Sequence, residues 1–190
     1  MNANEAVQSL QLKSIPLFAD FNETDCRQIA DVASVVTFDA EKLILKQGQV
    51  SRDLWIVLEG VCEVSRSLDT GMPDPKRMVL ATLESPSHFG DMSFFHPDSH
   101  SADVRAVGNV TLLKISYGDY KELVNDGVKA AYKLAYNVTV AMARRLRHMD
   151  DWIAEMVADA AGPVHDTNTS GLLRPEWTSF REKVFDRWNL

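Results

Sequence analysis

The feature that most constrains the fold is a series of short apolar-rich segments, separated by turn residues, between residues 35 and 115. Short strands at such regular spacing are typical of all-β sandwiches, jelly rolls and barrels. The sequence therefore predicts a mainly β domain. Its expected strands are Val35–Phe38, Leu43–Leu45, Leu54–Leu58, Val61–Val64, Met78–Leu83, Ala102–Ala106 and Val110–Ile115.

Helical patterns flank this β region on both sides. We expect an opening helix over residues 3–13 and a second over 23–33, with Asn22 as N-cap and Asp25 reaching back to the first amides. A short helix over 119–125 and a long one over 128–160 follow, and Gly162–Pro163 ends the long helix. We assign residues 1–160 to one domain, 161–174 to a polar linker and 175–190 to a C-terminal amphipathic helix.

Composition bounds the class of protein. The 190 residues are 45% hydrophobic, which indicates a folded chain. Their net charge of -7 argues against a nucleic-acid partner, because proteins that bind nucleic acids normally have a basic face. Cys26 and Cys62 lack metal-type spacing and are expected to be buried thiols. No segment has the length and apolarity of a membrane span, so we expect a cytoplasmic protein without a membrane partner.

The segment from Phe89 to Ala106 suggests the chemistry of a binding site. Its sequence predicts a strand end, one helical turn, a loop and a second strand. Free backbone N–H groups at a helix start attract anions, and phosphate above all. We therefore expect the amides between Gly90 and Ser93 to form an anion hole.

Several motifs, in the right order, resemble those of the cyclic-nucleotide-binding domain family. They are Ile44–Gly48 and Leu54–Gly60 (structural glycine motifs), Phe89–Ser93 and Ser101–Ala102 (ligand cassette), and Met142–Leu146 (the long helix of catabolite-activator-type proteins). The resemblance spans about Ile15 to Val157. It implies a jelly-roll-like β-roll (a double-stranded β-helix), followed by a short helix and a long C-terminal dimerisation helix.

The resemblance also implies a set of ligand-binding residues. Asp91 stands where the family has a ribose-binding glutamate, and it would pair with Arg145. His100 stands where the family has an arginine that neutralises the cyclic phosphate. Because histidine is mostly neutral at pH 7, His100 would be a weak, pH-dependent contact. The full set is Phe89, Gly90, Asp91, Met92, Ser93, His100, Ser101, Ala102, Arg145 and Met149, the last at an adenine-contacting position.

These substitutions leave three alternatives for the site. It binds a cyclic nucleotide (cAMP or cGMP) weakly or in altered form, it binds another small anionic ligand, or it binds nothing and the fold is a scaffold. No cofactor or metal is expected, since His88, His96 and His100 are interpreted as loop or surface histidines. No nucleophile–base pair or paired-carboxylate motif stands at a convincing spacing, so an enzyme is not expected.

The long helix suggests how the chain associates. Met142, Leu146, Met149, Ile153 and Met156 recur at alternating spacings of four and three residues, which predicts a homodimer through this helix. The alternative is that this stripe packs on the chain's own β-roll. The apolar stripe of residues 175–190 is expected to fold back, or else to dock a protein partner. With no recognition helix or basic arm after the long helix, we expect a stand-alone sensor or regulatory module that does not bind nucleic acid.

Overall fold

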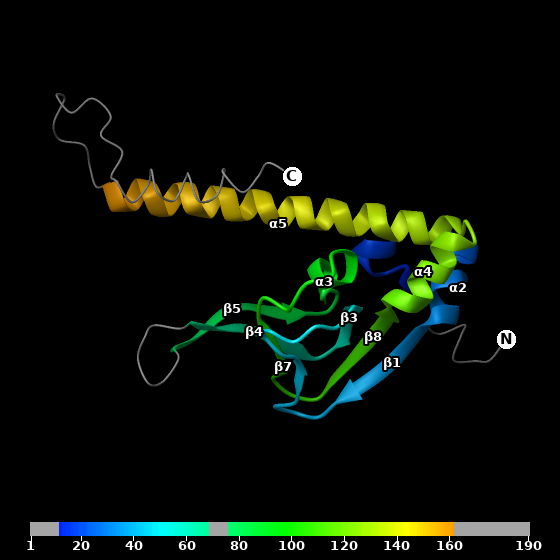
Figure 1. Cartoon of the computed structure of the whole chain (residues 1–190), viewed down its shortest axis with the longest axis horizontal. Coiled ribbons are helices and arrows are strands. Elements are labelled where there is room, and N and C mark those ends of the chain that lie inside the picture. Colours follow the sequence, from blue (N-terminus) through cyan, green and yellow to red (C-terminus); the bar gives the residue numbers. More distant parts are fainter. Residues whose placement is uncertain (1–11, 69–75, 162–190) are drawn as a thin grey trace, which may run out of the picture. The chain divides into compact units, whose positions relative to one another are not determined.

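The computed structural model of the chain describes residues 12–68 and 76–161 (Figure 1). It divides the chain into two compact units, residues 1–144 and 145–190. The predicted opening helix lies outside the described residues except for its last two positions. The predicted linker, except Ala161, and the C-terminal helix over 175–190 also lie outside them.

Two four-stranded antiparallel sheets form the β domain, which confirms the jelly-roll-like fold. The strand orders are β1-β8-β3-β6 and β2-β7-β4-β5, so strands that are neighbours in a sheet are distant in sequence. Every predicted strand is present, whereas β6 was expected only as a strand end. The bounds are β1 (Ala33–Phe38), β2 (Leu43–Leu45), β3 (Asp53–Glu59), β4 (Val61–Leu68), β5 (Lys76–Glu84), β6 (His88–Phe89), β7 (Asp103–Ala106) and β8 (Val110–Ser116).

The helices begin where the sequence supplies capping side chains. Asn22 caps α2 as predicted, because its Oδ1 accepts from the Asp25 amide at 2.8 Å while Asp25 Oδ2 accepts from the Asn22 amide at 3.0 Å. The helix α4 begins earlier than predicted because Ser116 Oγ accepts from the Asp119 amide at 3.2 Å. The described helical elements are η1 (Pro16–Phe18), α2 (Glu23–Val32), α3 (Asp91–Phe95), α4 (Tyr117–Asn125) and α5 (Lys129–Ala161).

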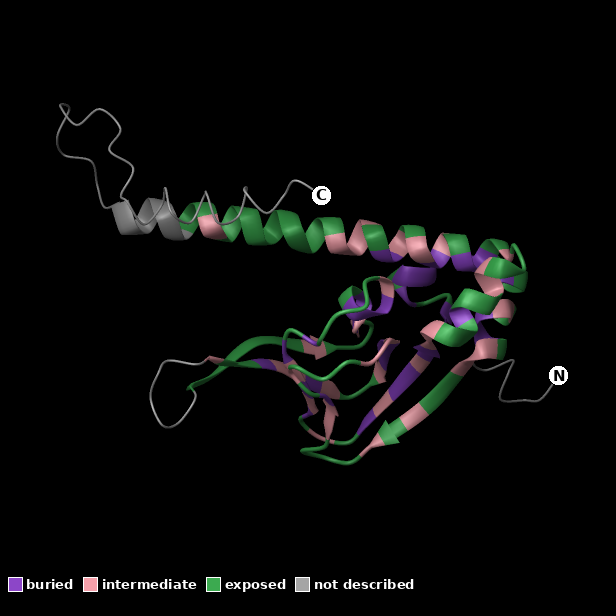
Figure 2. Ribbon diagram, in the orientation of Figure 1, coloured by how far each residue is buried: buried purple, intermediate pink, exposed green. Residues whose placement is uncertain are grey.

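Two apolar cores lie on opposite faces of the sheet that contains β3. Successive strand residues point to opposite faces, so Leu54 and Ile56 join the helical core, while Trp55 and Val57 join the core between the two sheets. In Figure 2 the buried residues gather on β3, β8 and the start of α5, and β5 is almost wholly exposed. β3 is therefore apolar on both faces, and its position is fixed from two sides.

The expectation of buried thiols is confirmed for both cysteines. Cys26 belongs to the helical core and Cys62 to the core between the sheets, and neither is in a disulfide. Burial raises the pKa of Cys62 to about 11, so its thiol stays protonated. None of the helices within residues 12–68 and 76–161 combines the length and apolarity needed to cross a bilayer.

A buried ion pair anchors the first part of α5 to α2. Lys133 Nζ lies 2.6 Å from Asp25 Oδ2 and donates to the carbonyl of Asp20 at 2.9 Å. Burial by itself would raise the pKa of Asp25, but the hydrogen bonds from Lys133 and Asn22, together with the charges of Lys133 and Lys129, bring the pKa below its ordinary value. The Asp25 carboxylate therefore stays ionised inside the protein.

Replacing Lys133 by methionine leaves this carboxylate buried without its counter-ion. We expect Lys133→Met to lower the free energy of unfolding by about 3–5 kcal/mol, measured by urea denaturation. The double variant Asp25→Asn/Lys133→Met removes the stranded charge and should recover part of the loss. Equal stability of Lys133→Met and the wild type would contradict the anchoring role.

Candidate functional site

The short helix α3 starts on a glycine that touches the backbone of β3. Gly90 is the N-cap of α3 and has a left-handed conformation, with φ of 81°. A Cβ added at Gly90 would lie 2.4 Å from the carbonyl oxygen of Asp53. Only glycine fits this conformation at this distance, so Gly90 determines where α3 meets β3. We call residues 89–102 the cassette.

The first turn of α3 bonds to its own carboxylate. The Met92 amide donates to Asp91 Oδ1 at 3.0 Å, and Asp91 Oδ2 lies 3.4 Å from His88 Nε2. Asp91 is only 3% exposed. The prediction that the Met92 amide is free is therefore wrong in this conformation, because a side chain of the protein itself occupies the place of an anion. The role of the Ser93 amide stays a prediction.

His100 is buried, with 7% of its surface exposed. Its amide donates to the Gln49 carbonyl at 2.8 Å and its carbonyl accepts from the Gly48 amide at 2.9 Å. His100 lies in the loop between α3 and β7, so the prediction of loop or surface histidines holds for it, and its side chain is buried in that loop. The prediction also holds for His96, which is exposed, and it is wrong for His88, which is partly buried on strand β6.

Both ring nitrogens of His100 contact serine hydroxyls. Nε2 lies 2.8 Å from Ser51 Oγ, and Nδ1 lies 3.2 Å from Ser93 Oγ. Burial lowers the pKa of His100 below its ordinary value, and the Asp53 carboxylate offsets only part of this effect. His100 is therefore neutral at pH 7, and it does not supply the positive charge of the family's arginine.

Ligand contacts by Phe89, Ser101 and Ala102 stay predictions. Phe89 stacks on Trp55, with ring centroids 6.3 Å apart and planes inclined by 11°. Ala102, directly before β7, is buried, whereas Ser101 is exposed. Among the described residues, Trp55 Nε1 is a buried side-chain atom with no hydrogen-bond partner. No three His, Cys, Asp or Glu side chains within residues 12–68 and 76–161 are placed to hold a metal ion.

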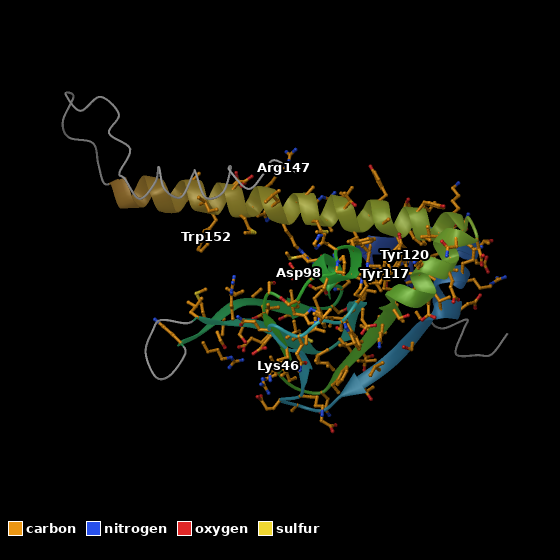
Figure 3. All side chains as sticks on the ribbon, in the orientation of Figure 1. Lys46, Asp98, Tyr117, Tyr120, Arg147 and Trp152 are labelled. Carbon is orange, nitrogen blue, oxygen red and sulfur yellow. The ribbon has the colours of Figure 1, made fainter. Side chains whose placement is uncertain are left out.

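Arg52 connects the end of α3 to the start of α4, and no sequence motif singles it out. Its Nη2 and Nε donate to the Phe94 carbonyl at 2.8 and 3.2 Å, and its Cζ lies 3.2 Å from the centroid of the Tyr117 ring. Figure 3 shows Tyr117 beside Tyr120 at this junction, and both rings pack on Phe94. Displacing α3 would therefore act directly on α4.

Two predicted site residues lie on the far part of α5, in the second compact unit. This unit begins at Arg145 and includes Met149, so the Asp91–Arg145 pair and a ligand contact by Met149 stay predictions. Met149 is 57% exposed, and Leu146 and Trp152 are exposed as well.

Sequence comparison relates this chain to a family with a defined ligand class. Residues 35–126 match the family model described as "Cyclic nucleotide-binding domain". The cAMP-dependent protein kinase regulatory subunit of Dictyostelium discoideum is 26% identical over 150 residues, which cover 78% of this chain and 44% of that protein. Isozyme 1 of the cGMP-dependent protein kinase of Drosophila melanogaster is 26% identical over 116 residues, which cover 60% of this chain and 15% of the kinase. The chain thus spans less than half the length of these relatives.

Solved structures confirm the fold. A cyclic nucleotide-binding domain from Methylobacillus flagellatus has a TM-score of 0.68 at 18% identity, covering 90% of this chain and 86% of that chain. The Thermus thermophilus catabolite activator protein has a TM-score of 0.65 at 25% identity, covering 74% of this chain and 62% of that protein. The regulatory subunit of a cAMP-independent protein kinase A from Trypanosoma brucei has a TM-score of 0.55 at 19% identity, covering 72% of this chain and 52% of that subunit.

The contact between Gly90 and β3 can be tested with a matched pair of glycines. Gly90→Ala places a methyl group 2.4 Å from the Asp53 carbonyl, whereas Gly48 has a similar φ of 80° but nothing within 4 Å of an added Cβ. We expect Gly48→Ala to lose about 1 kcal/mol of stability and Gly90→Ala to lose about 3 kcal/mol in chemical denaturation. Equal losses for the two variants would show that the contact adds nothing.

Proposed function

Because this chain belongs to the cyclic nucleotide-binding domain family, we propose that it is a regulatory sensor whose cassette receives the phosphodiester of a cyclic nucleotide. The observation that carries this proposal is the left-handed Gly90 held against Asp53, which sets the start of α3 beside β3. A first helical turn in this position directs backbone dipoles toward an anion. We propose cAMP or cGMP as the ligand, or a related small anion.

The side chains of the cassette imply weak binding at neutral pH. A neutral imidazole at His100 replaces a charge-assisted hydrogen bond by a neutral one, at a cost of about 1.5–3 kcal/mol, or about ten- to a hundred-fold in affinity. A phosphate that uses the Met92 amide must also displace the Asp91 carboxylate. Both effects lower affinity without removing the site.

A second candidate function is a ligand-free scaffold on the same fold. It is favoured by the hydrogen bonds inside the cassette, since His100 contacts two serine hydroxyls and the Met92 amide is satisfied by Asp91. These polar groups need no ligand to be paired. The similar trypanosome regulatory subunit is described as cAMP-independent, so the fold also occurs in a protein of that description.

We propose that ligand binding is transmitted along α3, α4 and α5. Arg52 bonds to the end of α3 and stacks on Tyr117 of α4, and Phe94 packs against the same ring. A shift of α3 would therefore move the start of α4, and through it the short connection to α5. Such rigid contacts can bias two arrangements of a helix.

We further propose that α5 forms a homodimer. Leu146 and Met149 are exposed and lie on the predicted a/d seam, and Trp152 is exposed beside it. Large apolar side chains that share one helix face are stabilised by pairing with the same face of a second copy. The predicted protein-docking role of residues 175–190 lies outside the described residues and remains a proposal.

The ligand proposal is tested by thermal shift with cAMP and with cGMP on the wild type and on His100→Arg. We expect a small, concentration-dependent rise in melting temperature for the wild type at about 1 mM, and about ten- to a hundred-fold tighter binding for His100→Arg. His96→Arg adds the same charge at an exposed loop position and should bind like the wild type. Absence of any shift in both the wild type and His100→Arg would favour the scaffold function.

The dimer proposal is tested by light scattering on the full chain at concentrations on the order of 10 µM. We expect the mass of two chains for the wild type and of one chain for Leu146→Glu, because a carboxylate at an a position is not tolerated in the seam. His148→Glu changes a residue outside the seam and should remain a dimer. A monomeric wild type would overturn the proposal.

A further inference from the structure

The direction of each hydrogen bond around His100 follows from which atoms can donate. Ser93 Oγ donates to the Gly90 carbonyl at 3.2 Å, which uses its single proton because a carbonyl only accepts. We assign the Ser93 proton to this carbonyl, which makes His100 Nδ1 the donor to Ser93 Oγ over 3.2 Å. A neutral imidazole has one N–H, so Nε2 accepts the hydroxyl proton of Ser51 over 2.8 Å.

This arrangement lowers the affinity of the cassette for anions at neutral pH. The Ser51 hydroxyl has its proton committed to His100, so only lone pairs of Oγ remain for other partners. A phosphodiester oxygen is an acceptor as well, and two acceptors do not bond. Neutral His100 and Ser51 therefore offer a phosphate neither charge nor a donor.

Protonation of His100 reverses the bond to Ser51. With a proton on Nε2, the imidazolium donates to Ser51 Oγ and the Ser51 hydroxyl is released to donate elsewhere. One proton therefore supplies a positive charge and a second hydrogen-bond donor. We propose that Ser51 is a phosphate-binding residue whose hydroxyl becomes a donor only when His100 is protonated, so that a phosphodiester monoanion binds with uptake of one proton. This inference rests on the proposed function.

The charges near His100 are consistent with a neutral resting state. Asp53 on β3 is the titratable group whose charge acts on His100, and Lys114 on β8 is the cation that faces Asp53. Asp53 favours the imidazolium, but its carboxylate also pairs with Lys114 at 3.3 Å. Burial is the larger effect, and it keeps the pKa of His100 below the ordinary value of about 6.5.

The pH dependence of binding follows from the coupling between ligand binding and protonation of His100. A ligand that prefers the imidazolium raises the pKa of His100 in the complex, so affinity should rise as pH falls, by up to about tenfold per pH unit. The stability of the ligand-free protein should change in the opposite sense. Its unfolded state has the higher histidine pKa, so protonation near pH 6 favours unfolding.

The test is isothermal titration of the full chain with cAMP and with cGMP between about pH 7.5 and pH 5.5. For the nucleotide that binds, we expect wild-type affinity to rise at least about tenfold over this range. His100→Gln cannot take up a proton and should show no rise, and His100→Arg should bind tightly at every pH. Ser51→Ala keeps the charge of protonated His100 but lacks the hydroxyl donor, so its affinity for the nucleotide should rise less than that of the wild type as pH falls. His96→Gln is the control and should follow the wild type.

Each outcome has a distinct meaning. Wild-type binding that does not vary with pH overturns this inference and leaves the proposed function intact, as does a full wild-type gain in Ser51→Ala. Absence of binding by both the wild type and His100→Arg at every pH overturns both proposals. Nitrogen-15 chemical shifts of the His100 ring give an independent check, because an Nε2–H tautomer in the neutral, ligand-free protein would falsify the assigned hydrogen bonds.

Discussion

The approach of Gly90 to the carbonyl of Asp53 is the constraint on which the rest of the site depends. A left-handed residue that close to β3 must be glycine, and it determines where α3 begins. From that start, the next turn places Phe94 in the helical core and its carbonyl against Arg52. The site and its connection to α4 are therefore consequences of one backbone contact, rather than of separate binding and signalling segments.

The cassette is stabilised without a ligand, which explains how its unusual residues are tolerated. An unpaired buried polar group costs about 1–3 kcal/mol, and the cassette avoids that cost by pairing His100 with two hydroxyls and the Met92 amide with Asp91. A ligand must therefore exchange these bonds for its own. The net free energy of ligand binding is therefore small, and a change in pH, which alters the charge of His100, can decide whether the ligand binds.

The sequence predicted most of the fold because the strands, caps and helices are encoded locally. Periodicity located the strands, and the Asn22–Asp25 capping box was visible as a pair three residues apart. The site was harder, since its decisive contacts join distant positions: Ser51 meets His100 across 49 residues and Arg52 meets Phe94 across 42. The burial of His100 was not predicted because its neighbours in sequence are polar, and the backbone bonds that hold it join Gly48 and Gln49, which are distant in sequence.

The two candidate functions can be understood as two protonation states of one cassette. With neutral His100, the hydrogen bonds are satisfied internally and the domain is a rigid scaffold. With charged His100, the same geometry gains a donor and a charge at the start of α3. An arginine at position 100 would hold the charged state permanently, so in the proposed mechanism it is the histidine that makes anion binding depend on pH. Under this proposal, the charge on the buried His100 side chain decides whether this chain acts as a sensor or as a scaffold.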